Sequence, residues 1–132
     1  MKPICKINRS GDKVWRLNGL LHREDGPAIE YANGTKKWYL NDKLHREDGP
    51  AYERASGDKF WYKNGLFHRE NGPACHYSNG DQEWYLNDKR HRADGPAVEY
   101  ANGYKEWYYQ DKSISCKDNQ EFLKIIKLIA FI

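Results

Sequence analysis

The sequence predicts an all-β repeat array, built from antiparallel β-hairpins with a 23-residue period and capped at its C-terminus by an α-helix. Three observations predict this fold class. A motif recurs at a fixed interval, Asn-Gly pairs separate short segments rich in aromatic residues, and only the last segment has helical hydrophobic spacing. A fixed period of this length is typical of proteins that stack equivalent structural units.

Tryptophans, His-Arg pairs and Gly-Pro pairs define the period. Each recurs every 23 residues, at Trp15, Trp38, Trp61, Trp84 and Trp107, at His22-Arg23, His45-Arg46, His68-Arg69 and His91-Arg92, and at Gly26-Pro27, Gly49-Pro50, Gly72-Pro73 and Gly95-Pro96. We predict one domain, with the array over residues 1–112 in units of about 1–19, 20–42, 43–65, 66–88 and 89–112, and a capping segment over 113–132. The first unit lacks the Gly-Pro pair, which is typical of a terminal repeat.

The composition suits a thin core between stacked units. The 132-residue chain is 39% hydrophobic with a mean hydropathy of -1.04, and 14% of its residues are aromatic. The 22 basic and 19 acidic residues leave a net charge of +3, which is too small and too evenly spread to favour nucleic acid as a partner.

The cysteines and the apolar segments indicate a cytoplasmic protein. The three cysteines, Cys5, Cys75 and Cys116, are odd in number and suit free thiols in a reducing compartment. The N-terminal eight residues contain no apolar run long enough for a secretory signal. The apolar stretch from Phe122 to Ile132 is too short to span a membrane, and lysines interrupt it.

Residues 28–32 and 35–40 form the first hairpin that we expect in a repeat. Asn-Gly between such segments is a strong hairpin signal, and a two-residue turn at Asn33-Gly34 would give both residues positive φ. Pairing outward from that turn puts Glu30 opposite Lys37 and Glu99 opposite Glu106, and the second pair does not fit. The same register faces an apolar residue with each tryptophan: Ile29 with Trp38, Tyr52 with Trp61, Cys75 with Trp84 and Val98 with Trp107.

A second tight turn follows in each repeat, at Asn41-Asp42, Asn64-Gly65 or Asn87-Asp88. It leads into the His-Arg pair and then into an acidic turn such as Glu47-Asp48-Gly49-Pro50. Each repeat is therefore predicted to contain two short strands, or three if the segment that carries the His-Arg pair also forms one.

The segment after the repeats predicts a helix. Asp118 is a suitable N-cap with Glu121 three residues later, and Phe122, Ile125, Ile126 and Ile129 form an i, i+3, i+4, i+7 stripe. We expect this helix to cover the open edge of the last strand. The alternative is a surface for a homodimer or for another partner.

The spacing of the histidines argues against an enzyme and against a metal site. Catalytic and metal sites bring different residues to one point, whereas a repeat array places equivalent residues about 10 Å apart in a row. We therefore expect a ladder of histidines beside the tryptophans and no catalytic residue, metal or cofactor.

Two rows of side chains are the candidate binding surface. The arginines could contact anions, although they could instead pair with acidic residues of the adjoining turns. The tyrosines are predicted to lie opposite alanines on the exposed face, where they form either a binding strip or a second core layer. The candidate residues are Arg23, Arg46, Arg69, Arg92, Tyr39, Tyr62, Tyr85 and Tyr108, with Ala28, Ala51, Ala74 and Ala97 opposite the tyrosines.

Residues 61–74 read Trp-Tyr-x-Asn-Gly-x-x-His-Arg-x-Asn-Gly-Pro-Ala, which resembles the MORN repeat family. That family has a Trp or Tyr, an Asn-Gly and a His-Gly-x-Gly step, and this chain has His-Arg-x-x-Gly-Pro in place of the last. The repeats also resemble the His-Arg-Glu-Asp-Gly-Pro-Ala repeats of large phages and giant DNA viruses. The resemblance covers about residues 5–112 and implies binding of proteins or lipid head groups, and similar units in a bacterial antitoxin family imply protein neutralisation.

The function that we expect is a non-enzymatic repeat scaffold that binds a protein partner, as a viral inhibitor that occludes a host defence or toxin component. That expectation rests on analogy between folds. One alternative is sequestration of a small anionic ligand such as a nucleotide, held between aromatic rings and arginines. Another is peripheral membrane binding through the basic row and the C-terminal helix.

Overall fold

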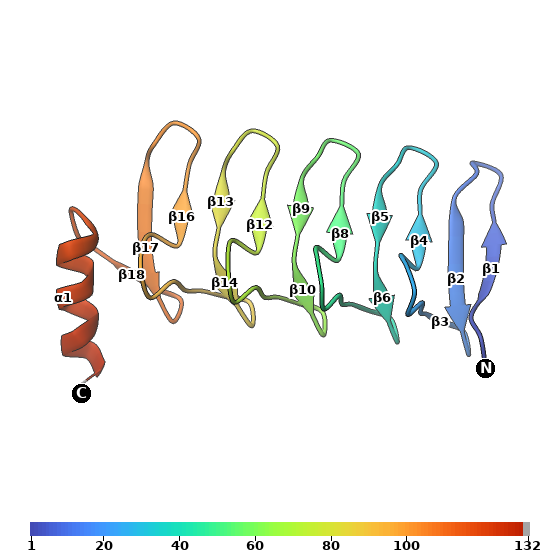
Figure 1. Cartoon of the computed structure of the whole chain (residues 1–132), viewed down its shortest axis with the longest axis horizontal. Helices are drawn as coiled ribbons and strands as arrows, with labels where there is room; N and C mark the ends of the chain where they lie inside the picture. Colours follow the sequence, from blue (N-terminus) through green and yellow to red (C-terminus); the bar gives the residue numbers. More distant parts are fainter. Residues whose placement is uncertain (131–132) are drawn as a thin grey trace.

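The computed structural model describes residues 1–130. Its β-hairpins stand side by side in one row, with the N-terminal hairpin at one end and helix α1 (Asn119–Ala130) at the other (Figure 1). The longer hairpins join into a 12-stranded sheet that runs the length of the row almost entirely in chain order. The predicted all-β repeat array with a C-terminal helix is confirmed.

Each central repeat contains four short strands in two antiparallel hairpins. In the first of these repeats β4 (Ile29–Glu30) pairs with β5 (Lys36–Lys37), and β6 (Tyr39–Leu40) pairs with β7 (Lys43–Leu44). The next two repeats contain β8 (Tyr52–Glu53), β9 (Lys59–Phe60), β10 (Tyr62–Lys63), β11 (Leu66–Phe67), β12 (Cys75–His76), β13 (Gln82–Glu83), β14 (Tyr85–Leu86) and β15 (Lys89–Arg90).

The two ends of the array have fewer strands, and four of these six strands are longer than those of the central repeats. It begins with β1 (Ile4–Ile7), β2 (Lys13–Leu17) and β3 (Leu20–Leu21), and it ends with β16 (Val98–Glu99), β17 (Lys105–Tyr109) and β18 (Lys112–Ile114). The last hairpin therefore extends two residues into the segment predicted as the cap. Residues 131 and 132, the end of the predicted capping segment, lie outside the described residues.

The first hairpin of each repeat differs by one residue from the predicted register. The Tyr31 N–H donates to the carbonyl oxygen of Thr35 at 2.8 Å, so the loop has three residues and not two. Of the Asn-Gly pair only Gly34 has positive φ, at +96°. This is the three-residue connection in which a left-handed glycine follows a type I turn. Ile29 therefore pairs with Lys37, and the predicted opposition of apolar residues to tryptophans is wrong in this repeat.

The same shift holds in the other repeats. Tyr52 pairs with Phe60, Cys75 with Glu83, and Val98 with Glu106, so no tryptophan stands opposite these residues. The shift also removes the like-charge pair that the predicted register contained. Glu99 faces Lys105 rather than Glu106.

The turn with two positive φ values is the second one. Asn41 and Asp42 have φ of +49° and +66°, and Asn64 and Gly65 have +52° and +81°. These values define a type I′ turn, which matches the twist of a two-residue hairpin and favours Asn, Asp and Gly. In the central repeats, each type I′ turn joins the two strands of the second hairpin, such as β6 and β7.

Main-chain hydrogen bonds join neighbouring repeats at several levels. β5 pairs with β8 of the next repeat, and beside it the Trp38 N–H donates to the Ala51 carbonyl oxygen at 2.7 Å. Nearer the hairpin tips, the Asp58 carboxylate accepts the Ser78 N–H at 2.7 Å, and this bond lowers the pKa of Asp58. The alanines of the seam, Ala28, Ala51, Ala74 and Ala97, are all 0% exposed.

Helix α1 closes the C-terminal end of the row. Asp118 caps it by accepting the Glu121 N–H at 2.9 Å, as the sequence predicts. Phe122 is 0% exposed, and the indole N–H of Trp107 donates to the side-chain oxygen of Asn119 at 2.8 Å. The helix therefore covers the last tryptophan, which has no following His-Arg pair. Its opposite face leaves Leu128 69% exposed.

Candidate functional site

Each His-Arg pair of the array places its arginine on the tryptophan that precedes the arginine by eight residues. The guanidinium carbon lies over the indole ring at 3.9 Å from the ring centroid for Arg46 on Trp38. The other three stacks are Arg23 on Trp15 at 3.9 Å, Arg69 on Trp61 at 3.9 Å and Arg92 on Trp84 at 4.1 Å. This is the geometry of a cation–π contact, which stabilises by about 0.5–2 kcal/mol depending on burial.

The Gly-Pro pair holds the same guanidinium from its other side. The Nη1 of Arg46 donates to the Pro50 carbonyl oxygen at 3.0 Å, and Nε donates to Asp48 at 3.2 Å. A Cβ at Gly49 would lie 2.9 Å from the guanidinium carbon, so a larger residue there would displace the guanidinium from its place over the indole. The motif His-Arg-x-x-Gly-Pro is therefore a clamp for an arginine.

Carboxylates, and not arginines, dominate the edge that these turns present to solvent. The side chains of Arg23, Arg46 and Arg92 are 22–24% exposed. The side chains of Glu24, Asp25, Glu47, Asp48, Glu70 and Asp94 are 74–88% exposed. Pairing of arginines with the acidic turns, the second of the two interpretations from the sequence, describes three of the four arginines; Arg69 is the exception.

The histidines form the predicted ladder. His45 Nδ1 accepts the N–H of Asn64 in the next type I′ turn at 3.0 Å. His22, His68 and His91 accept the N–H of Asn41, Asn87 and Gln110 in the same way, at 2.9–3.1 Å. Because Nδ1 is the acceptor, the proton of a neutral ring lies on Nε2, which in His45 faces Glu47 at 2.7 Å. These side chains connect repeats.

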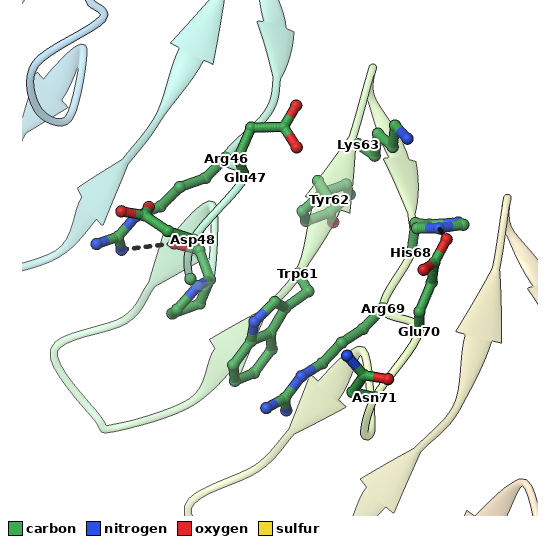
Figure 2. Close-up of a pocket in the computed structure, with 12 residues that line it drawn as sticks. Arg46, Glu47, Asp48, Trp61, Tyr62, Lys63, His68, Arg69, Glu70 and Asn71 are labelled. Carbon is green, nitrogen blue, oxygen red and sulfur yellow. Dashed lines mark hydrogen bonds and ion pairs between the residues drawn. The ribbon is translucent and has the colours of Figure 1, made fainter.

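A groove separates three of the clamped arginines, Arg23, Arg46 and Arg69, from the tryptophan of the next repeat. Figure 2 shows the Trp61 groove, in which the indole of Trp61 lies between Arg69 and the turn that carries Asp48. Its volume is about 550 Å³, and the equivalent Trp38 and Trp84 grooves measure about 630 and 680 Å³. Three consecutive repeats thus present the same concave feature along one row.

The charge of the grooves changes along the row. The Trp38 groove is lined by four carboxylates, from Glu24, Asp25, Glu47 and Asp48, against two arginines. The Trp61 groove has three carboxylates against two arginines and Lys63, because Asn71 stands where the other repeats have aspartate. In the Trp84 groove, two carboxylates face two arginines.

The predicted tyrosine row is partly buried among aromatic rings. Tyr62 stacks on Phe67 at 4.5 Å between centroids, and Phe67 stacks on Tyr85 at 5.1 Å. Burial raises the pKa of Tyr62 to about 12. Tyr39 pairs with Leu44 of the small hairpin, so the predicted pairing of tyrosines with alanines is wrong. Of the two interpretations of this row, the packing matches a second core layer, and Tyr62 also borders the Trp61 groove.

Arg90 belongs to this aromatic layer, which the sequence did not predict. Its guanidinium donates to the hydroxyls of Tyr85 at 3.1 Å and Tyr108 at 3.3 Å, and to Glu83 at 3.3 Å. Arg90 occupies the repeat position of Leu44 and Phe67. A charged residue at an otherwise apolar position was the available signal. Arg90, which is not one of the four candidate arginines, thus contacts two of the candidate tyrosines within this aromatic layer.

The described residues 1–130 contain no group of three or more His, Cys, Asp or Glu side chains placed to hold a metal ion. Within the same residues no helix has the length and apolar character needed to cross a membrane. The chain matches no protein-family model and no curated protein sequence. The resemblance to MORN-type repeats therefore stays a prediction.

Proposed function

We propose that this chain is a non-enzymatic scaffold that binds a protein partner along its row of grooves. One observation carries the proposal: the Trp38, Trp61 and Trp84 grooves repeat one concave feature in one direction, each between a tryptophan and an acidic turn. Repeat arrays that present equivalent concave features in a row characteristically bind extended surfaces. A partner with side chains at matching intervals would occupy several grooves at once.

Basic side chains of the partner are the best fit for the Trp38 groove. Its two arginines already donate to the Pro27 and Pro50 carbonyl oxygens and pair with aspartates. The groove therefore offers an indole and four carboxylates, all of them more than 75% exposed. An ammonium or guanidinium group could contact both, and charge complementarity of this kind fixes the register of an interface and accelerates association.

The partner that we propose is a host-cell protein, which the scaffold inhibits by covering its surface. The resemblance of the repeats to those of large phages and giant DNA viruses supports a host defence or toxin component in the cytoplasm. Occlusion needs only a rigid complementary surface. The main-chain bonds between neighbouring repeats support such rigidity.

The test combines native mass spectrometry with a pair of charge variants. The protein is incubated with host lysate, repurified and weighed, and we expect a retained protein mass. Glu24→Gln with Glu47→Gln should weaken retention at least tenfold, because both carboxylates line the Trp38 groove. Ala32→Lys with Ala55→Lys adds the same net charge at the hairpin tips and should retain the partner.

Two results would contradict the proposal. Equal retention by the two pairs of variants would place the partner elsewhere on the molecule. A retained mass below about one kilodalton would favour sequestration of a small ligand instead.

A further inference from the structure

Arg69 differs from the other clamped arginines in its partners. Arg23, Arg46 and Arg92 each pair with one aspartate two residues later and with one glutamate seven residues later. At the corresponding positions after Arg69 stand Asn71 and His76. Among the described residues 1–130, the one hydrogen-bond acceptor that the Arg69 guanidinium contacts is the Pro73 carbonyl oxygen, at 3.1 Å from Nη1.

The Arg69 guanidinium is nevertheless held in the same place as its equivalents. It lies over Trp61 at 3.9 Å, the distance found for Arg46 on Trp38. A Cβ at Gly72 would lie 2.9 Å from its guanidinium carbon, as at Gly49 for Arg46. The stack and the proline carbonyl thus fix the group, while Nε points to the side on which an aspartate is bound in the other repeats.

The surroundings of Arg69 are partly buried and leave its charge uncompensated. Burial lowers the pKa of Arg69, and no carboxylate offsets that effect. Arg69 borders both the Trp61 and the Trp84 grooves, so solvent and ligands can approach it. The nearest acidic residue in sequence, Glu70, faces His68 Nε2 at 3.5 Å.

We propose that Arg69 is a vacant carboxylate-binding site, in which an external carboxylate takes the position that Asp25, Asp48 and Asp94 fill in the other repeats. The carboxylate accepts from Nε and from a terminal nitrogen of the guanidinium, and the Asn71 amide is close enough in sequence to donate as well. Two parallel charge-assisted bonds to a fixed, planar group are the arrangement that favours carboxylates. This site does not depend on the proposed protein partner.

Two sources could supply the carboxylate: a small free acid, or an aspartate or glutamate side chain of another protein. The experiment therefore has two probes, sodium acetate and a short blocked peptide with one central aspartate. Both are titrated at constant ionic strength set with sodium chloride. The arginine Nε–Hε signals are followed by NMR, because they report each guanidinium separately.

We expect acetate to shift the Arg69 signal in a saturable way in the millimolar range, as for one partly exposed ion pair. The Arg23 and Arg92 signals should not respond. Asn71→Asp restores the aspartate of the other repeats and should weaken acetate binding at least tenfold without disturbing the fold. Conversely, Asp48→Asn with Glu53→His reproduces the surroundings of Arg69 around Arg46, and the Arg46 signal should then respond.

An Arg69 signal that stays unmoved by both probes would overturn the proposal, as would equal responses of wild type and Asn71→Asp. Equal shifts of all four clamped arginines would also overturn it, because they would reflect general screening. Tighter binding of the peptide than of acetate would identify an acidic protein segment as the source. Acetate binding without peptide binding would identify a small free acid.

Discussion

A clamped arginine such as Arg46 is held from three sides at the scale of single residues. Trp38 supplies a ring face, Pro50 a carbonyl oxygen, and Asp48 and Glu53 supply carboxylates. Only a planar group with several fixed donors can satisfy all of these partners together. The arginines that have these partners therefore hold the turns to the tryptophans. Carboxylates of the same molecule largely compensate their charge.

Replacing a clamped arginine by lysine tests this account. Arg46→Lys should lower the free energy of unfolding by about 1–2 kcal/mol, because an ammonium group cannot stack flat and donate to Pro50 and Asp48 together. Arg69→Lys should lower the free energy of unfolding clearly less, since Arg69 has no carboxylate partner within residues 1–130. Urea unfolding of the two variants measures the difference, and a larger loss for Arg69→Lys would contradict it.

The burial of His91 predicts that the stability of the protein depends on pH, and a residue near the ring can modify this dependence. The pKa of His91 is lowered because the ring is partly buried. The ring packs beside Tyr109, with 4.8 Å between the ring centroids. Two residues after His91 stands Ala93, whereas His22, His45 and His68 are each followed at that position by a glutamate. The folded pKa lies below the unfolded one, so the unfolded chain binds the proton more tightly. Stability from His91 is then complete above about pH 6.5, the unfolded value, and is lost as the pH falls from there through the lower folded pKa.

The variant Ala93→Glu should reduce this loss, because a carboxylate near Nε2 favours the protonated ring. Melting temperatures at about pH 7.5 and about pH 5.5 give the comparison, with Ala93→Gln as the uncharged control. All other titrating groups are common to the three proteins. The same fall in melting temperature for Ala93→Glu and Ala93→Gln would contradict the prediction, because it would show that a carboxylate at position 93 does not act on His91.

At the scale of elements, the sequence predicted which segments pair but not how far each strand is shifted. Asn-Gly suits both a two-residue type I′ turn and the end of a three-residue loop, and the hydrogen bond from Tyr31 to Thr35 selects the loop. A one-residue shift moves every side chain to the other face of the sheet. That shift explains why the predicted partner of Trp38 was wrong. The predicted partner of Tyr39 was wrong because Tyr39 belongs to a second hairpin, in which it pairs with Leu44.

The candidate site was predictable only in part for the same reason. The arginine row was visible as a period, but its stacking on the tryptophans depends on how the His-Arg turn folds back. The exceptions were visible as substitutions within the repeat: Asn71 for aspartate, His76 for glutamate and Arg90 for leucine or phenylalanine. Their consequences required the geometry of the intact repeats for comparison. The helix was predicted well, because its N-cap and its apolar stripe are local signals.

Helix α1 should stabilise the array through Phe122. Phe122→Ala should lower the free energy of unfolding by about 3 kcal/mol, because the ring is 0% exposed and its removal leaves a cavity. Leu128→Ala, on the exposed face of the same helix at 69% exposure, should change it by less than about 0.5 kcal/mol. Urea unfolding compares the two. Amide exchange of Phe122→Ala should then be faster in β17 and β18, next to the helix. An equal effect of both variants would contradict the role of Phe122 in holding the helix against the array.

At the scale of the whole molecule, the array is uniform in its main chain and graded in its charge. The bonds between repeats recur with nearly constant lengths, such as 2.7 Å from Trp38, Trp61 and Trp84 to the next alanine carbonyl. The grooves in contrast change from four carboxylates around Trp38 to two around Trp84. The guanidinium of Arg69, whose one acceptor among the described residues is the Pro73 carbonyl oxygen, lies at the Trp84 groove. A partner that is complementary to this gradient can bind in only one direction along the row.

The repeat period itself predicts which deletions the chain tolerates. Removing residues 43–65 joins Asp42 to Leu66 in phase, so that Arg69 follows Trp38 by the usual eight residues and can stack on it. Because each repeat contacts mainly its neighbours, this variant should stay folded, with a circular dichroism spectrum like that of the full chain and a lower urea midpoint. Removing residues 43–64 shifts the phase by one residue and turns each later side chain to the wrong face, so it should lose cooperative unfolding. Equal stability of the two deletions would contradict this prediction, because it would show that the turn accommodates the extra residue without a change of register.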